Sequence, residues 1–151
     1  MSDTIFDKIV RGEISAHKVW EDENYLAFLT PFANTPGVTV VIPKINLGDY
    51  AFALTPDQLT GLMLAVQKVA NVLEKAFDVQ KVAMVFEGEG VPYVHAKLYP
   101  MHGELGEGGD YEVSEKVFFT KYPGYITTAE GPQMSDEALT AIQQKIVEAA
   151  S

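Results

Sequence analysis

The sequence contains no cysteine. This absence excludes a disulfide framework, a thiolate metal site and a catalytic thiol, and it fits a reducing compartment. No apolar run approaches the roughly 18 residues that a membrane-spanning helix needs. The N-terminal sequence also lacks the basic start and the apolar run of a secretory signal peptide. We therefore expect a cytoplasmic protein.

Basic residues are scarce as well. The chain has 11 Lys and Arg residues against 21 Asp and Glu residues, which gives a formal net charge of −10. Such a surface repels nucleic-acid backbones and anionic membranes, so we expect neither as a partner. A ligand that carries phosphate needs a local positive potential, at a place where Lys, Arg, His or free backbone N–H groups converge.

The chain of 151 residues is long enough for one domain with a sizeable core. Apolar spacing predicts a short helix over residues 4–14, a hairpin over 17–29, strands over 38–43, 81–87 and 93–99, a long helix over 55–77 and a last helix over 135–150. Thr55, Pro56 and Gln58 form the capping pattern that begins the long helix. We interpret residues 112–132 as extended chain lying over the core. Antiparallel strands with one long helix between them predict a two-layer α+β domain.

The strand over 93–99 carries an unusual alternation. Residues two apart in a strand share a face, so Val94, Ala96 and Leu98 point together toward the core. Tyr93, His95 and Lys97 then share the opposite face. The preceding loop holds Gly88 and Gly90, and glycines let a backbone approach a ligand and expose N–H groups to it. This arrangement suits a phosphoryl group, although the polar face of a half-exposed strand is the alternative.

Five blocks of the chain, in order, resemble the histidine triad (HIT) superfamily of nucleotide hydrolases and transferases. They are residues 4–14, 21–28, 34–37, 40–44 and 88–99, and the last block matches the family motif His-φ-His-φ-His-φ-φ, where φ is apolar. The chain departs from the family pattern at five positions: Tyr93 and Lys97 replace the first and third histidines, Val38 and Asn46 stand where histidine is frequent, and Thr30 stands where an acidic ribose ligand is frequent. The resemblance implies a divergent branch with a HIT-like domain over residues 1–110 and a C-terminal extension over 111–151 packed on it.

By this resemblance His95 is the catalytic nucleophile, which attacks the α-phosphorus of a nucleotide and forms a covalent nucleotidyl-imidazole. Lys97 contacts the phosphate as a permanent cation, and Gly88 and Gly90 supply close backbone contacts. An ammonium is a poorer proton donor than an imidazole near pH 7, which favours a good leaving group such as a polyphosphate or an acyl phosphate. Tyr93 either hydrogen-bonds the ligand or caps the strand, and both roles stay open.

The same alignment gives the remaining substrate contacts for an expected purine nucleotide. The base pocket comprises Ile5, Phe6, Ile9 and Phe28, and the ribose contacts are Leu29 and Thr30. At helical or strand spacing the four apolar residues also fit a plain core. His17 and His102 fit solvated surface positions, and the alternative for His102 is a return to the site as an acid. No third ligand stands at a recognisable spacing from His95 and His102, so we expect no metal. We expect no cofactor either. The resemblance also implies a homodimer.

Three functional hypotheses follow. The first is a nucleotide hydrolase that acts on a dinucleoside polyphosphate or a nucleoside phosphoramidate, favoured by His95 and the Gly88/Gly90 loop. The second is a catalytically degenerate protein that binds or senses a nucleotide, favoured by the loss of the flanking histidines and of the ribose acid. The third is a dimeric interaction module with a vestigial site.

Overall fold

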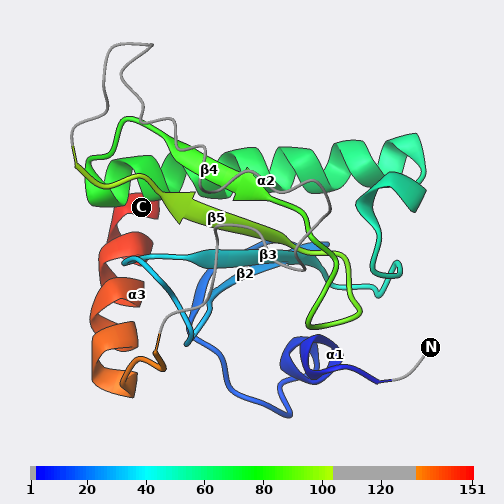
Figure 1. The fold of residues 1–151 in the computed structure, drawn as a ribbon, viewed down its shortest axis with the longest axis horizontal. Coiled ribbons are helices and arrows are strands. Elements are labelled where there is room, and N and C mark those ends of the chain that lie inside the picture. Colours follow the sequence, from blue (N-terminus) through cyan, green and yellow to red (C-terminus); the bar gives the residue numbers. More distant parts are fainter. Residues whose placement is uncertain (1–2, 104–131) are drawn as a thin grey trace, which may run out of the picture.

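The computed structural model describes residues 3–103 and 132–151. Its elements are α1 (Ile5–Val10), β1 (Lys18–Glu21), β2 (Tyr25–Leu29), β3 (Thr39–Pro43), the 3-10 helix η1 (Ala51–Ala53), α2 (Pro56–Phe77), β4 (Val82–Val85), β5 (Ala96–Pro100) and α3 (Asp136–Ala150). The strands form one antiparallel sheet in the order β1-β2-β3-β5-β4 (Figure 1). Within these residues no helix is long and apolar enough to cross a membrane.

The long helix α2 begins and ends where its sequence dictates. The Thr55 hydroxyl accepts from the Gln58 amide while the Gln58 side chain accepts from the Thr55 amide, so the predicted capping box is confirmed. Pro56 occupies the first turn, where its missing N–H costs no helical hydrogen bond. Asp78 ends the helix in the left-handed conformation, with φ at 51°.

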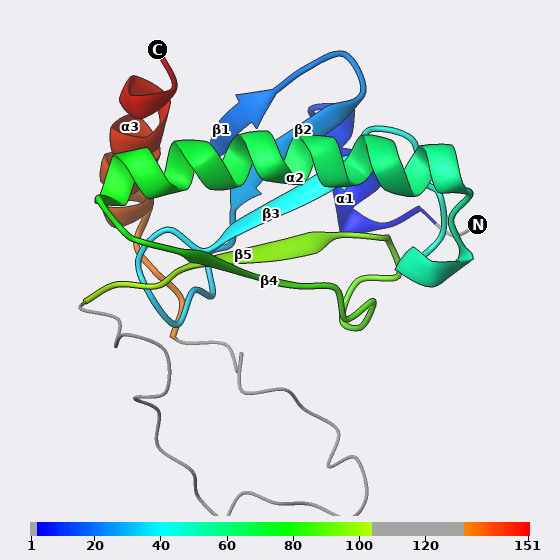
Figure 2. The same cartoon turned by 90° about the horizontal axis from the view of Figure 1, so that it is seen from above.

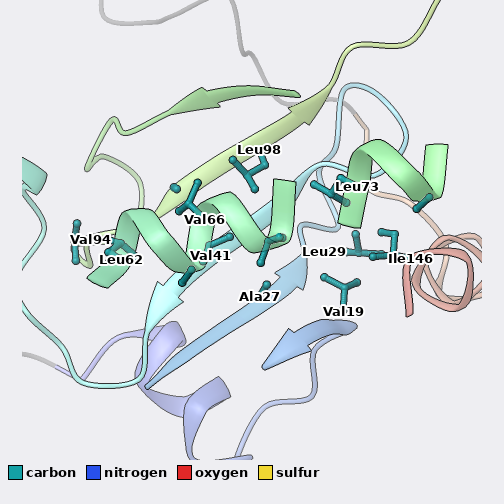
Figure 3. Close-up of a cluster of buried hydrophobic side chains, with 14 of the residues drawn as sticks. Val19, Ala27, Leu29, Val41, Leu62, Val66, Leu73, Val94, Leu98 and Ile146 are labelled. Carbon is teal, nitrogen blue, oxygen red and sulfur yellow. The ribbon is translucent and has the colours of Figure 1, made fainter. Parts of the chain in front are cut away.

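One face of the sheet packs against α2 and α3, as Figures 1 and 2 show. Residues on one face of β1, β2, β3 and β5 meet the apolar stripes of both helices. This cluster includes Val19, Ala27, Leu29, Val41, Leu62, Val66, Leu73, Val94, Leu98 and Ile146 (Figure 3). Ile146 is fully buried in this cluster, so α3 shares the core of the sheet and α2. Burial of the apolar stripe of α3 therefore holds the C-terminal helix on the domain.

The other face of the sheet packs against α1. Its cluster comprises Phe6, Ile9, Leu26, Phe28, Val40, Ile42 and Tyr93. Phe28 pairs with Val40 and Leu26 pairs with Ile42 across β2 and β3, and paired residues lie on the same face. The face that carries α1 is therefore the face on which the Tyr93, His95 and Lys97 alternation lies.

The α+β class and the antiparallel sheet are confirmed. The strand expected over residues 93–99 begins only at Ala96. The reason is that the Val94 amide donates to the Gly48 carbonyl and the Tyr93 amide to the Val91 carbonyl, so neither joins the ladder. Residues 112–131 of the expected extended segment, and the boundary expected near residue 110, lie outside the described residues.

Candidate functional site

His95 lies just before β5, and its side chain is almost entirely buried, with 3% exposed. Its Nδ1 is 2.6 Å from the Tyr93 carbonyl oxygen. The Phe6 ring packs against the imidazole edge to face, with ring centroids 5.3 Å apart. The carbonyl and the Phe6 ring together fix the position and the tilt of the imidazole.

The surroundings of His95 favour a neutral ring with the proton on Nδ1. A backbone carbonyl can only accept, so Nδ1 must donate to it and Nε2 keeps its lone pair. Burial lowers the pKa of His95, and the nearby Lys97 charge lowers it further, whereas the Tyr93 carbonyl and Glu87 act in the opposite direction. The net shift is downward, which favours the neutral form of the ring at pH 7.

Lys97 shares the sheet face of His95. It lies two residues further along the chain, pairs with Val40 on one side and with Val85 on the other, and is half-buried. Arg11, Lys18 and Lys44 are each bound to a carboxylate, whereas Lys97 makes no ion pair within the described residues. Its charge acts on the imidazole of His95, whose pKa it lowers.

The glycine loop before β5 is held against the β3–η1 connection. Gly88 and Gly90 have φ angles of 78° and 81°, which only glycine adopts without strain. A Cβ on Gly88 would lie 2.7 Å from the Asp49 carbonyl oxygen, whereas a Cβ on Gly90 would meet no atom within 4 Å. At Gly88, the absence of a side chain lets the loop backbone approach Asp49. At Gly90, the space that a side chain would occupy is open.

A small pocket of about 20 Å³ opens beside His95, enough for roughly one water molecule. Its lining comprises Asp49, Tyr50, Ala51, Phe52, Phe86, Glu87, Gly88 and His95. Two of these residues carry carboxylates and none carries a permanent positive charge. The pocket therefore joins the imidazole to a rim that is aromatic and acidic.

Of the two roles left open for Tyr93, a hydrogen bond from its side chain to the ligand is wrong. Tyr93 is fully buried, and its hydroxyl donates to the Pro43 carbonyl oxygen at 2.6 Å. Burial also raises the pKa of this hydroxyl. The polar outer face that formed the alternative is also wrong for Tyr93 and His95, because α1 covers both residues. Tyr93 serves the site through its backbone carbonyl and its packing.

Among the expected base and ribose contacts, Phe6, Ile9 and Phe28 are brought together in the cluster beneath α1. Ile5 stands apart from that cluster with 48% of its surface exposed. The Leu29 side chain is buried in the cluster facing α2 and α3, since it follows Phe28 in a strand and must face the other way, so a ribose contact at Leu29 falls to its backbone. Thr30 is partly exposed, and its hydroxyl accepts from the Phe32 amide at 3.2 Å.

A polar link that the sequence did not predict joins α1 to the segment before His95. The Asn46 amide donates to Asp7 Oδ2 at 3.3 Å, and Asn46 Oδ1 accepts from the Gly48 amide. The Gly48 carbonyl then accepts from the Val94 amide at 2.6 Å, one residue before His95. The spacing of Thr4 and Asp7, which is typical of a capping box, was the sequence signal that pointed to Asp7. Asp7 does complete the capping box of α1.

The other two histidines lie away from His95. His102 is exposed, as expected, at the far end of β5, where Nε2 contacts the Pro36 carbonyl and the ring packs on Phe77. His17 was expected to be solvated, but α3 partly covers it, and Asp136 lies 3.1 Å from its Nε2. In the described part of the chain, no group of three or more His, Asp or Glu side chains is placed to hold a metal ion.

Comparison with known proteins supports the resemblance to the HIT superfamily. The family model described as HIT domain matches residues 11–102. An uncharacterized HIT-like protein of Methanocaldococcus jannaschii is 35% identical over 107 residues, covering 68% of this chain and 82% of that protein. Protein hit of Bacillus subtilis is 32% identical over 109 residues, covering 69% and 74%. The crystal structure of a Hit-like protein from Bartonella henselae superposes with a TM-score of 0.69 at 26% identity, covering 97% of this chain and 96% of that one. The chain belongs to the HIT domain family.

Proposed function

We propose that this protein is a nucleotide hydrolase that cleaves at the α-phosphate of a dinucleoside polyphosphate or a nucleoside phosphoramidate. His95 is the nucleophile, and the reaction passes through a covalent nucleotidyl-histidine. The observation that supports this proposal most directly is the 2.6 Å contact between His95 Nδ1 and the Tyr93 carbonyl. It leaves a lone pair on Nε2, the atom that must attack.

In the first step, the Nε2 lone pair attacks the α-phosphorus and forms a phosphorus–nitrogen bond. The bond from phosphorus to the leaving group breaks, and the leaving group departs with that electron pair. The imidazole then carries a positive charge, which the Tyr93 carbonyl stabilises through Nδ1–H. Lys97 faces the same side and stabilises the negative charge on the phosphoryl oxygens.

In the second step, water attacks the phosphorus and the phosphorus–nitrogen bond breaks. The electron pair returns to Nε2, the proton of the water passes to solvent, and a nucleoside monophosphate is released. Division into two steps lowers the barrier that a direct attack by water would face. The depressed pKa of His95 keeps the regenerated ring neutral and ready for another cycle.

The phosphate and base contacts extend the proposal. The backbone at Gly88 and Gly90 approaches the phosphate, and the space beside Gly90 accommodates that approach. The base, expected to be a purine, lies near Phe6, Phe28 and the exposed side of Ile5, and the Thr30 hydroxyl lies near the ribose.

We also propose a homodimer, from the family resemblance, and a cytoplasmic location, from the absence of cysteine.

The alternative function is a catalytically degenerate protein that binds or senses a nucleotide. It is favoured by Tyr93 and Lys97 in place of histidines, since neither supplies a second imidazole for proton transfer. A vestigial site in a dimeric interaction module is a weaker alternative, because the depressed pKa of His95 and the charge of Lys97 beside it persist.

One experiment separates these functions. The protein is incubated with a diadenosine polyphosphate and, separately, with an adenosine phosphoramidate, and the products are separated by chromatography. Release of AMP that depends on His95 supports the hydrolase. Saturable binding of AMP without turnover of either compound supports the binding protein. If the protein neither turns over these compounds nor binds AMP, only the interaction module remains.

A further inference from the structure

One peptide group holds the imidazole of His95 in place. It joins Tyr93 to Val94, and its carbonyl oxygen lies 2.6 Å from His95 Nδ1. Its N–H belongs to Val94 and donates to the Gly48 carbonyl, also at 2.6 Å. A peptide group is planar and rigid, so a bond at the N–H fixes the direction of the C=O. Because β5 begins only at Ala96, this peptide is held by Gly48 and not by the ladder of the sheet.

Gly48 is in turn held by the side chain of Asn46. Asn46 Oδ1 accepts from the Gly48 amide at 3.0 Å, and Gly48 has a φ of 91°, which glycine adopts without strain. The nitrogen of the same side chain, Nδ2, donates to Asp7 Oδ2 at 3.3 Å. Asparagine meets both demands, whereas an ionised aspartate in its place could accept from Gly48 but could not donate to Asp7.

Asp7 ties these bonds to α1. Its Oδ2 also accepts from the Thr4 amide at 2.8 Å and from the Thr4 hydroxyl at 2.7 Å. Burial raises the pKa of Asp7, but the hydrogen bonds from Thr4 and Asn46 outweigh this effect, so the net shift is downward and favours the carboxylate. Phe6, the preceding residue, packs its ring on the imidazole of His95. Helix α1 therefore reaches His95 twice, directly through Phe6 and through the bonds that begin at Asp7.

We propose that Asp7 and Asn46 are positioning residues for His95. Through Gly48 they fix the peptide between Tyr93 and Val94, and this peptide selects the tautomer that leaves the lone pair on Nε2. This inference rests on the proposed function of His95. Because the two side chains act through the backbone, their loss is expected to lower the fraction of His95 in the reactive tautomer, and hence kcat, while nucleotide binding changes little.

An exchange of the two side chains tests the link. Asn46→Asp removes the donor and sets a second carboxylate against Asp7, which breaks the link. The double variant Asp7→Asn/Asn46→Asp exchanges amide and carboxylate, so a donor and an acceptor face each other again. Nitrogen NMR of the imidazole at about pH 8, where histidine is neutral, measures the tautomer without substrate. We expect a single tautomer with the proton on Nδ1 in the wild type, both tautomers in Asn46→Asp, and the single tautomer again in the double variant.

Turnover of an adenosine phosphoramidate gives the second readout. Misplacement of a catalytic group by about 1 Å can cost two orders of magnitude, so kcat of Asn46→Asp is expected to fall by about 10- to 100-fold while KM changes little. In the double variant kcat is expected to recover to within about threefold of the wild type, because two changes compensate only if the side chains interact. Asn46→Ala breaks the link without adding a charge and is expected to show both tautomers as well. Asn24→Asp is the matched control: it adds the same charge at an exposed position between β1 and β2, and neither readout is expected to change.

The outcomes separate this inference from the proposed function. A folded Asn46→Asp or Asn46→Ala that keeps the single tautomer and the wild-type kcat would overturn the positioning role and leave the hydrolase intact. A double variant that regains stability in urea but neither the tautomer nor kcat would also overturn it, because the pair would then serve the fold alone. If the wild type turns over no nucleotide while the tautomers follow the expected pattern, the hydrolase is wrong and the control of His95 by Asp7 and Asn46 is supported.

Discussion

The Nδ1 atom of His95 lies 2.6 Å from the carbonyl oxygen of Tyr93, two residues earlier in the chain. The Tyr93 side chain is itself fixed by the bond from its hydroxyl to the Pro43 carbonyl, at the end of β3. The side chain that replaces the first histidine of the motif therefore anchors the backbone that orients the second. The tautomer of His95 depends on the packing of a buried tyrosine.

Tyr93→Phe tests this anchor. The variant leaves the buried Pro43 carbonyl without its partner, so we expect the free energy of unfolding to fall by about 1–3 kcal/mol. Tyr50→Phe is the control, since Tyr50 is exposed and its hydroxyl has no hydrogen bond within the described residues; a change within about 0.5 kcal/mol is expected there. Urea titrations of the two variants compare the losses, and equal losses would contradict the role of Tyr93.

The pKa of His95 should respond in opposite directions to two neighbours. Lys97 lowers this pKa and Glu87 raises it, so Lys97→Met is expected to shift it upward and Glu87→Gln downward. Titration of the imidazole by NMR measures both shifts, and the acid limb of kcat/KM should move with them. Shifts of the same sign would show that His95 does not lie in the electrostatic surroundings described above.

The same pKa links stability to pH. The ring binds its proton less tightly in the folded protein than in the unfolded chain, whose ordinary value is 6.5. The unfolded chain therefore takes up more protons below that pH, and stability is expected to fall as pH decreases from about 6.5 until the folded ring is protonated too. His95→Asn should flatten that part of the stability profile, and an unchanged slope between wild type and variant would count against burial as the cause.

Lys97→Ala is expected to weaken binding of a nucleoside monophosphate by about 1.5–3 kcal/mol, the range for a hydrogen bond to a charged group. The affinity for the nucleoside should stay unchanged, because that ligand lacks the phosphate. Lys68→Ala removes the same charge from an exposed position on α2 and serves as the control. Calorimetric titration with both ligands measures the difference, and a nucleoside that binds the wild type as tightly as the nucleotide would place the phosphate elsewhere.

The proposed homodimer is expected to use the β4 edge of the sheet, which has no further strand within the described residues. β4 is the last strand in the sheet order, and its Met84 is 43% exposed. Lysine on an edge strand opposes edge-to-edge pairing, so Met84→Lys is expected to shift a dimer toward monomer. Light scattering at micromolar concentration measures the mass of both proteins, and a monomeric wild type would contradict the proposal.

Much of the fold follows from local sequence signals. The capping box at Thr55 and the alternation of Val94, Ala96 and Leu98 predicted α2 and the inward face of β5 correctly. The burial of Tyr93 and His95 could not be predicted from that alternation, because it depends on α1, which packs there from far away in the sequence. Strand periodicity does separate the side chains of Phe28 and Leu29, since neighbours in a strand face opposite sides, and the two are buried in different clusters.

The role of His95 as a covalent nucleophile is tested most directly by trapping the intermediate. Wild-type protein is incubated with substrate, quenched in base, digested and analysed by mass spectrometry. We expect a nucleotidyl adduct on the peptide that spans Val91 to Lys97, labile to acid and stable to base. In His95→Asn, which keeps a donor of similar size, we expect no adduct and a loss of turnover of at least ~10³-fold with ground-state binding retained. Turnover in His95→Asn close to that of the wild type, with no adduct on the wild-type peptide, would contradict that role.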